Sequence, residues 1–153
     1  LTAREPIAKR LVAEAPADPG AEELSRFCSS KHLPMVLVTS SNQASFLYKT
    51  SGHPWMEFIQ SRVLGDDSEL SAGKPAPAPY LLASQRLGVS PGECWVFEDS
   101  RAGCQSALEA GCWVWQLVDS ISAPEGMQHS RLTLITSLRE GEEQLRYSLS
   151  TNG

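Results

Sequence analysis

The sequence predicts an α/β fold with a doubly wound, mostly parallel, Rossmann-like sheet. Short apolar runs at residues 35–38, 94–97 and 112–115 contain β-branched and aromatic residues and show no alternation with polar ones. Runs of this kind are typical of strands buried on both faces, which occur in parallel sheets. From residue 35 onward these runs alternate with stretches of helical spacing, and this alternation indicates helices that cover both faces of one sheet.

The elements follow in chain order from apolar spacing and from the positions of proline and glycine. Residues 7–14 have the spacing of a helix, and Pro16, Pro19 and Gly20 interrupt the chain after it. A second helix carries apolar residues at 24, 27 and 28 and ends before Pro34. Further helices are predicted to begin near 39–42, to cover about 80–87, to run up to Ala110 after the strand at 94–97, and to cover about 137–149. Strands are predicted at 35–38, 61–64, 94–97, 112–115 and 132–135.

Composition restricts the class of protein. The 153 residues are enough for one domain with a core, and the net charge of −5 with scattered basic residues shows no nucleic-acid footprint. No apolar run approaches the ~20 residues of a membrane span, and the first residues do not resemble a signal peptide. The four cysteines form no C-x-x-C pair and do not cluster with the histidines, so we expect no zinc site and a reduced, cytoplasmic protein.

The most informative stretch is the acidic turn after the apolar run Cys94–Phe97. Glu98 and Asp99 follow that run directly, at what would be the carboxyl end of a strand. Ligands bind at this edge of open α/β sheets, and two adjacent carboxylates repel each other unless a cation lies between them. Oxygen ligands favour Mg²⁺. A solvated turn with Asp99 or Ser100 as helix N-cap explains the same residues without a metal.

Two further features complete a set that could bind a phosphoryl group. Thr39 and Ser40 follow the run at 35–38, where a hydroxyl and backbone N–H groups at a helix start bind phosphate oxygens. Pro75 restricts the backbone of Lys74, and a positioned ammonium neutralises a phosphoryl oxygen. Taken singly, the first feature is an ordinary N-cap and the second a surface turn. Hydroxyl, lysine and acidic pair together are the parts that hold a phosphoryl group and Mg²⁺.

The phrases that contain these residues resemble a known family. They are Thr-Ser-Ser-Asn at 39–42, Gly-Asp-Asp at 65–67, Gly-Lys-Pro-Ala-Pro at 73–77 and Phe-Glu-Asp-Ser-Arg-Ala-Gly at 97–103. In this order they resemble the haloacid dehalogenase-like (HAD) hydrolases, and more closely the branch of phosphoglycolate phosphatases and β-phosphoglucomutases. The resemblance covers residues 16–118, with one departure at Ala78, where the family usually has Asp.

The resemblance implies Mg²⁺-dependent phosphatase chemistry on a small phosphorylated metabolite. Its residues map onto this chain as catalytic Thr39 and Lys74, phosphate-binding Thr39, Ser40, Asn42 and Lys74, and metal-binding Glu98 and Asp99. Ser100 is a further candidate beside the substrate or behind the metal ligands. The cap domain sets specificity in this branch, so the substrate itself is not predicted. A dinucleotide site is disfavoured because no Gly-x-Gly-x-x-Gly follows a strand.

The family's first motif, Asp-x-Asp-Gly after a strand, does not occur. The five aspartates stand at 18, 66, 67, 99 and 119, and none is a credible substitute for the nucleophile. We therefore expect the family fold without its N-terminal strand and most of its cap. Residues 1–15 are predicted to be the remnant of a cap helix and residues 16–153 the core domain.

This loss has chemical and structural consequences. The chain is expected to be an inactive or weakly active HAD-like hydrolase; the alternative is a non-catalytic phosphate- or metal-binding protein or a purely structural one. In the family the missing strand lies between those at 35–38 and 94–97, so each would have an unpaired edge, which promotes association. These strands could pair directly, a homodimer could cover the gap, or the missing part could belong to a longer product.

Overall fold

One parallel sheet forms the centre of the molecule. The computed structural model describes residues 10–13, 20–50, 54–59, 61–120 and 128–152. Its six strands lie in the order β3-β2-β1-β4-β5-β6, and every neighbouring pair is parallel. The strands are β1 (Arg10–Ala13), β2 (Met35–Val38), β3 (Ser61–Val63), β4 (Cys94–Glu98), β5 (Trp113–Leu117) and β6 (Leu132–Ile135).

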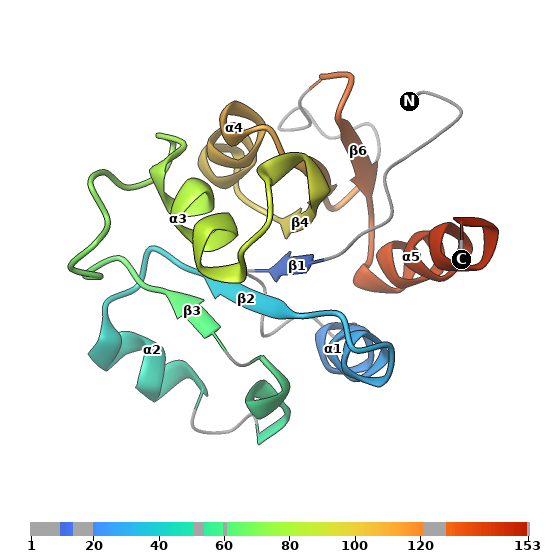
Figure 1. The fold of residues 1–153 in the computed structure, drawn as a ribbon, viewed down its shortest axis with the longest axis horizontal. Coiled ribbons are helices and arrows are strands. Elements are labelled where there is room, and N and C mark those ends of the chain that lie inside the picture. The colour runs from blue at the N-terminus through green and yellow to red at the C-terminus, as the bar shows by residue number, and fades with distance from the viewer. Residues whose placement is uncertain (1–9, 14–19, 51–53, 60, 121–127, 153) are drawn as a thin grey trace.

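Helices cover both faces of this sheet, which confirms the predicted doubly wound α/β fold. The α-helices α3 and α4 lie on one side, and α1 and α5 lie together on the other (Figure 1). Gly88 ends α3 in the left-handed conformation, with φ of 73°. The helices are α1 (Ala21–Ser30), α2 (Gln43–Thr50), α3 (Ala78–Leu87), α4 (Arg101–Ala110) and α5 (Leu138–Asn152), with short 3₁₀ helices η1 (Pro54–Phe58) and η2 (Pro91–Glu93).

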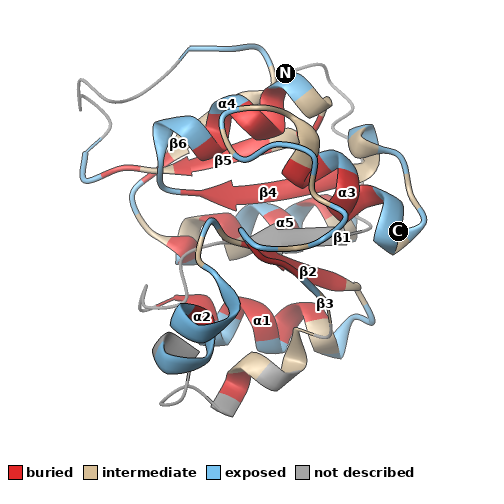
Figure 2. Cartoon of the chain, turned by 90° about the vertical axis from the view of Figure 1, so that its left-hand side faces the viewer, coloured by how far each residue is buried: buried red, intermediate tan, exposed pale blue. Residues whose placement is uncertain are grey.

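Alternate residues of the central strands pack on opposite faces of the sheet. In β4, Trp95 and Phe97 join the cluster formed with α1 and α5, whereas Cys94 and Val96 join the cluster formed with α3 and α4. Both β2 and β4 are buried along their whole length (Figure 2). The predicted strands of this region are therefore confirmed. By the same alternation, Glu98 falls on the face that α3 and α4 cover.

The helix predicted over residues 7–14 is wrong for Arg10–Ala13, which form β1. The run Arg-Leu-Val-Ala is short and mostly apolar, and such a run is compatible with either state. The two apolar strands beside it decide the outcome, because their buried N–H and C=O groups need hydrogen-bonding partners. The remaining residues of the predicted helix, and the proposed domain boundary at residue 15, lie outside the described residues.

The unpaired central edges that we expected do not occur. Strand β1 pairs with β2 through Leu11 and Met35, and with β4 through Leu11 and Trp95. The position that the family's first-motif strand occupies is thus filled from within this chain. A homodimer is no longer needed to cover a gap in the sheet.

Candidate functional site

A buried ion pair lies where β4 ends. The Lys74 ammonium lies 2.7 Å from Oε2 of Glu98, and the two side chains are 5% and 0% exposed. Glu98 is the last residue of β4, and Lys74 lies in the turn that leads into α3. Burial raises the pKa of Glu98, but the Lys74 charge and the hydrogen bonds to the carboxylate outweigh it, so the pKa is lowered overall. The pair is therefore a charged one.

The turn after Glu98 caps a helix, which is one of the two interpretations that the sequence left open. Ser100 is the N-cap of α4, and its hydroxyl oxygen accepts from the Gly103 N–H at 2.9 Å. Asp99 is exposed beside it. Partial burial and the negative charge of Glu98 raise the pKa of the Asp99 carboxyl. The turn thus caps a helix and also presents a carboxylate whose ionised form a cation would stabilise.

The turn after β2 holds the residues predicted to bind phosphate. The Thr39 hydroxyl oxygen accepts from the Ser41 N–H at 3.2 Å, and the Ser41 carbonyl accepts from the Gly65 N–H at 2.8 Å. Ser40 is exposed. Asn42 is also exposed, and its Oδ1 accepts from the Ser45 N–H at 2.8 Å, which caps the first turn of α2. The Asn42 oxygen is thus already engaged in the helix.

Lys74 connects the two turns. Its ammonium contacts the Val38 carbonyl oxygen at 3.4 Å, one residue before Thr39, while it pairs with Glu98 on the other side of β1. The structure therefore brings Lys74 to the carboxyl ends of both β2 and β4, beside Thr39 and Asp99. This is the edge of an open α/β sheet at which ligands bind.

No group of three or more histidine, cysteine or acidic side chains that could hold a metal occurs in the described part of the chain. Mg²⁺ does not require one, because it keeps several waters and is commonly bound by one or two carboxylates together with substrate phosphate. The exposed Asp99 carboxylate fits this requirement. Glu98 is less accessible, because its carboxylate is already occupied by hydrogen bonds.

Two residues of this site were not predicted from the sequence. The hydroxyl of Tyr80, in α3, donates to Oε2 of Glu98 at 2.6 Å, and Tyr80 is 1% exposed. Gly103, in α4, lies so near that a Cβ there would meet Glu98 Cδ at 2.0 Å. The glycine that ends the resembling phrase at 97–103 was the only sequence signal for that contact. Tyr80 stands at the expected start of the helix over about 80–87, and no motif marked it.

A surface ion pair holds the loop that follows β3. The Arg86 guanidinium, in α3, donates to both carboxylate oxygens of Asp67, at 2.6 and 2.8 Å. The hydrogen bond from Arg86 lowers the pKa of Asp67. The preceding Asp66 accepts from the Gln43 N–H at 3.1 Å, at the start of α2. The Gly-Asp-Asp loop is thus anchored to α3 on one side and to the Thr39–Asn42 turn on the other.

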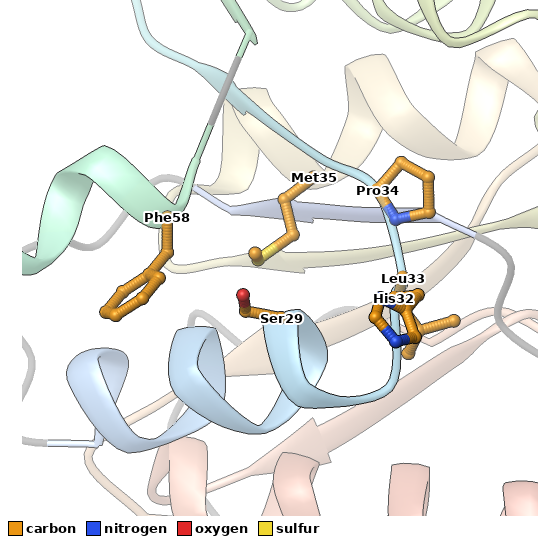
Figure 3. Close-up of a pocket in the computed structure, with 6 residues that line it drawn as sticks. All are labelled: Ser29, His32, Leu33, Pro34, Met35 and Phe58. Atoms are coloured by element: carbon orange, nitrogen blue, oxygen red, sulfur yellow. The ribbon is translucent and has the colours of Figure 1, made fainter.

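A pocket of about 260 Å³ lies away from this edge (Figure 3). It is near the amino end of β2, where Met35 begins the strand, whereas Thr39 follows the carboxyl end. Its lining residues are Ser29, His32, Leu33, Pro34, Met35 and Phe58. None of the residues predicted for phosphate or metal binding borders it.

Fold and site together define a doubly wound α/β protein that gathers a lysine, an acidic pair and a hydroxyl-bearing turn at the carboxyl ends of its strands. Residues 3–111 match the profile of the haloacid dehalogenase-like hydrolases, and the chain belongs to this family. No helix among the described residues has the length and apolar character needed to cross a membrane.

Relatives and solved structures agree with this assignment. The chain is 34% identical over 137 residues to hexitol phosphatase A of Escherichia coli, covering 88% of this chain and 58% of that protein. It is 36% identical over 128 residues to a probable pseudouridine-5'-phosphatase of Drosophila melanogaster, covering 81% of this chain and 55% of that one. A putative β-phosphoglucomutase from Thermotoga maritima superposes with a TM-score of 0.68 at 28% identity, covering 89% of this chain and 61% of that one. The chain thus spans little more than half the length of these two curated relatives.

Proposed function

We propose that this chain carries the phosphate- and cation-binding part of a Mg²⁺-dependent phosphatase site that acts on a small phosphorylated metabolite. The observation that carries the proposal is the placement of Lys74, which reaches the carboxyl ends of β2 and β4 at once. A single ammonium there can face a phosphoryl group that lies between the Thr39 turn and Asp99. The names of the relatives, which are phosphatases, support the same class of reaction.

Each residue has a chemical role in this proposal. Thr39 and the backbone N–H of Ser40 bind phosphoryl oxygens at the start of α2, where N–H groups and the helix dipole favour an anion. Lys74 neutralises a further phosphoryl oxygen as a point charge. Asp99 faces the cation, and Mg²⁺ bound there would neutralise charge on the phosphoryl oxygens. Glu98 holds the Lys74 ammonium in place through the buried ion pair.

These 153 residues contain no Asp-x-Asp-Gly motif, so the sequence identifies no carboxylate that would attack phosphorus. Removal of one member of a catalytic unit commonly costs about 10⁴- to 10⁶-fold in rate. We therefore propose that this chain alone hydrolyses phosphate esters very slowly or not at all, while it still binds phosphate. A cytoplasmic location is a further proposal that follows from the sequence alone, whereas the homodimer expected to cover a gap in the sheet loses that reason because β1 fills the gap.

Calorimetry with inorganic phosphate and Mg²⁺, together with hydrolysis of an aryl phosphate, tests the proposal on the purified chain. We expect millimolar-range phosphate binding that Lys74→Ala weakens about tenfold, since it removes a charge-assisted hydrogen bond. Lys31→Ala, at an exposed lysine after α1, is the matched control and should leave binding unchanged. Absence of phosphate binding to the wild type would contradict the proposed function, and fast Mg²⁺-dependent turnover would contradict the predicted low activity.

A non-catalytic phosphate- or metal-binding role is the second candidate. The observation that favours it is that Thr39, Lys74 and Asp99 lie at one edge of the sheet while the Asp-x-Asp-Gly motif is absent. Phosphate binding with no detectable turnover, even when synthetic peptides that contain an Asp-x-Asp-Gly strand are supplied, would favour this role.

A further inference from the structure

The carboxylate of Glu98 has no capacity left for another ligand. Its Oε2 accepts from Lys74 Nζ at 2.7 Å and from the Tyr80 hydroxyl at 2.6 Å. Its Oε1 accepts from the Asp99 N–H at 3.1 Å and from the N–H and hydroxyl of Ser100, both at 3.2 Å. A carboxylate offers about four lone-pair positions, so the five donors exhaust them.

The surroundings of Glu98 also leave it no room to turn. Its side chain is 0% exposed, and a Cβ placed on Gly103 would lie 2.0 Å from Cδ and 2.1 Å from Oε2. The backbone of α4 is therefore in close contact with the carboxyl group. To reach a cation at the surface, Glu98 would have to give up a charged pair and a short hydrogen bond to a buried hydroxyl, which are among the stronger interactions in proteins.

Tyr80 fixes the same ammonium from another direction. Its ring centroid lies 5.5 Å from Lys74 Nζ, within the range of a cation–π contact, while its hydroxyl donates to the oxygen that Lys74 also contacts. By sharing Oε2, the hydroxyl offsets part of the negative charge that would otherwise hold Lys74 alone. The ammonium is thus oriented by Glu98 and Tyr80 together and contacts Val38 at the edge of the sheet.

Asp99 differs from Glu98 in burial and in the hydrogen bonds of its carboxylate. It is exposed, whereas Glu98 is buried, and its backbone N–H is one of the donors to Oε1 of Glu98, at 3.1 Å. The two neighbouring acids are therefore not equivalent.

We infer that Glu98 is not a cation ligand in this chain but acts with Tyr80 as a positioning residue for the Lys74 ammonium, which leaves Asp99 as the member of the acidic pair that faces a cation. The cation half of this inference rests on the proposed function. The positioning half rests on the contacts of Glu98 and Tyr80 alone.

The test uses the full chain and the variants Tyr80→Phe, Glu98→Gln and Asp99→Asn. Tyr147→Phe is the control, because Tyr147 is 68% exposed on α5. Mn²⁺ serves as a paramagnetic probe for a divalent cation, and inorganic phosphate as the anion. We expect Asp99→Asn to weaken Mn²⁺ binding about tenfold or more, whereas Tyr80→Phe leaves it unchanged and Glu98→Gln changes it by less than about fivefold.

The ammonium itself supplies a readout that needs no ligand. A lysine NH₃⁺ held in hydrogen bonds away from water gives a separate ¹H–¹⁵N signal, because its protons exchange slowly. We expect this signal for Lys74 in the wild type, Asp99→Asn and Tyr147→Phe, a shifted signal in Tyr80→Phe, and none in Glu98→Gln. Tyr80→Phe should also weaken phosphate binding roughly fivefold, as expected for a lost hydrogen bond beside a charged group.

The outcomes separate this inference from the proposed function. Loss of Mn²⁺ binding in Glu98→Gln to the same extent as in Asp99→Asn would show that Glu98 is a ligand and would overturn the inference. An unchanged Lys74 signal in Tyr80→Phe would overturn the role of Tyr80, and this conservative variant decides the question if Glu98→Gln fails to fold. A wild type that binds neither Mn²⁺ nor phosphate would overturn the proposed function and the role of Asp99, while the ammonium signal would still decide how Lys74 is held.

Discussion

The two turns at the carboxyl edge of the sheet are built in different ways. The turn after β4 is organised around one buried charge, with five donors on the Glu98 carboxylate. The turn after β2 is held by backbone contacts: Gly65 donates to the Ser41 carbonyl and lies against Ser40. Ser40 and Asn42 are exposed, whereas the Glu98 side chain is 0% exposed.

The two turns should therefore differ in their sensitivity to substitution. A buried charge is costly to leave unpaired, so the β4 turn should be sensitive to the loss of any partner. An exposed turn can shift and exchange its bonds with water, so the β2 turn should tolerate change better. The rigid turn and the adaptable turn therefore lie at the same edge of the sheet, with β1 between the two strands that carry them.

The largest effect is expected from removing the partner of Glu98. Lys74→Met leaves a buried carboxylate without its counter-charge, and such losses cost about 3–5 kcal/mol of unfolding free energy at neutral pH. Urea unfolding at pH 7 measures this cost. Without the charge of Lys74, burial raises the pKa of Glu98, so the deficit in unfolding free energy should shrink as the pH falls and Glu98 takes up a proton.

The double variant Lys74→Met, Glu98→Gln tests the interpretation of that result. With both charges gone, part of the lost stability should return, since the penalty comes from the unpaired charge. A Lys74→Met variant that loses less than about 1 kcal/mol would contradict the view that the β4 turn is organised by this pair.

Glycine substitutions compare the two turns directly. At Gly103 a Cβ would meet the Glu98 carboxyl carbon at 2.0 Å, and at Gly65 it would meet the Ser40 carbonyl oxygen at 2.1 Å. We expect Gly103→Ala to cost about 3 kcal/mol, because the buried carboxylate cannot move, and Gly65→Ala about 1–2 kcal/mol, because the exposed turn can. Chemical denaturation gives both values.

Gly73→Ala is the matched control for these variants, since no atom lies within 4 Å of a Cβ there. It should leave stability almost unchanged. If Gly65→Ala proved more costly than Gly103→Ala, the two turns would not differ in rigidity as we infer.

The smallest effect is expected from the Asp67–Arg86 pair, which anchors the loop behind the β2 turn. The pKa of Asp67 is lowered in the folded state, so the pair stabilises the fold above the unfolded value of about 4 and this contribution disappears as pH falls through the folded value. Asp67→Asn keeps an oxygen for the Glu69 N–H but removes the charge. We expect a loss of about 0.5–1 kcal/mol at pH 7.

Thermal unfolding of the wild type and Asp67→Asn between pH 7 and pH 3 checks this prediction. The difference between them should narrow below about pH 4. Asp119→Asn, at an exposed aspartate after β5 with no ion pair in the described part of the chain, should show no such change. A constant difference across the range would mean that the charge of Asp67 does not contribute.

Much of the fold follows from local pattern. The runs at 35–38 and 94–97 are apolar at every position, so both faces of each strand have to be covered by other elements. In the structure these runs form β2 and β4, and both strands are buried. Gly88 and Gly111 mark helix ends because both adopt positive φ. The residues of the candidate site were also found by pattern, since the ends of parallel strands meet at one edge.

Other features depended on partners distant in sequence. Arg10–Ala13 have the spacing of a helix, and only the hydrogen-bonding demand of β2 and β4 makes them a strand. Tyr80 belongs to no motif of the sequence, and its hydroxyl contacts Glu98 only because α3 packs over the end of β4.

The fold class, the family and the charged and hydroxyl-bearing residues at the strand ends follow from periodicity and short motifs. The central strand of the sheet and the different burial of the two adjacent acids follow from packing between segments distant in the chain. Glu98 and Asp99 are adjacent in the chain, but strand alternation and the close approach of α4 bury one and expose the other. Burial and the number of hydrogen bonds that a carboxylate accepts are properties of the packed chain, so the identities of residues 98 and 99 alone do not show which of them is buried.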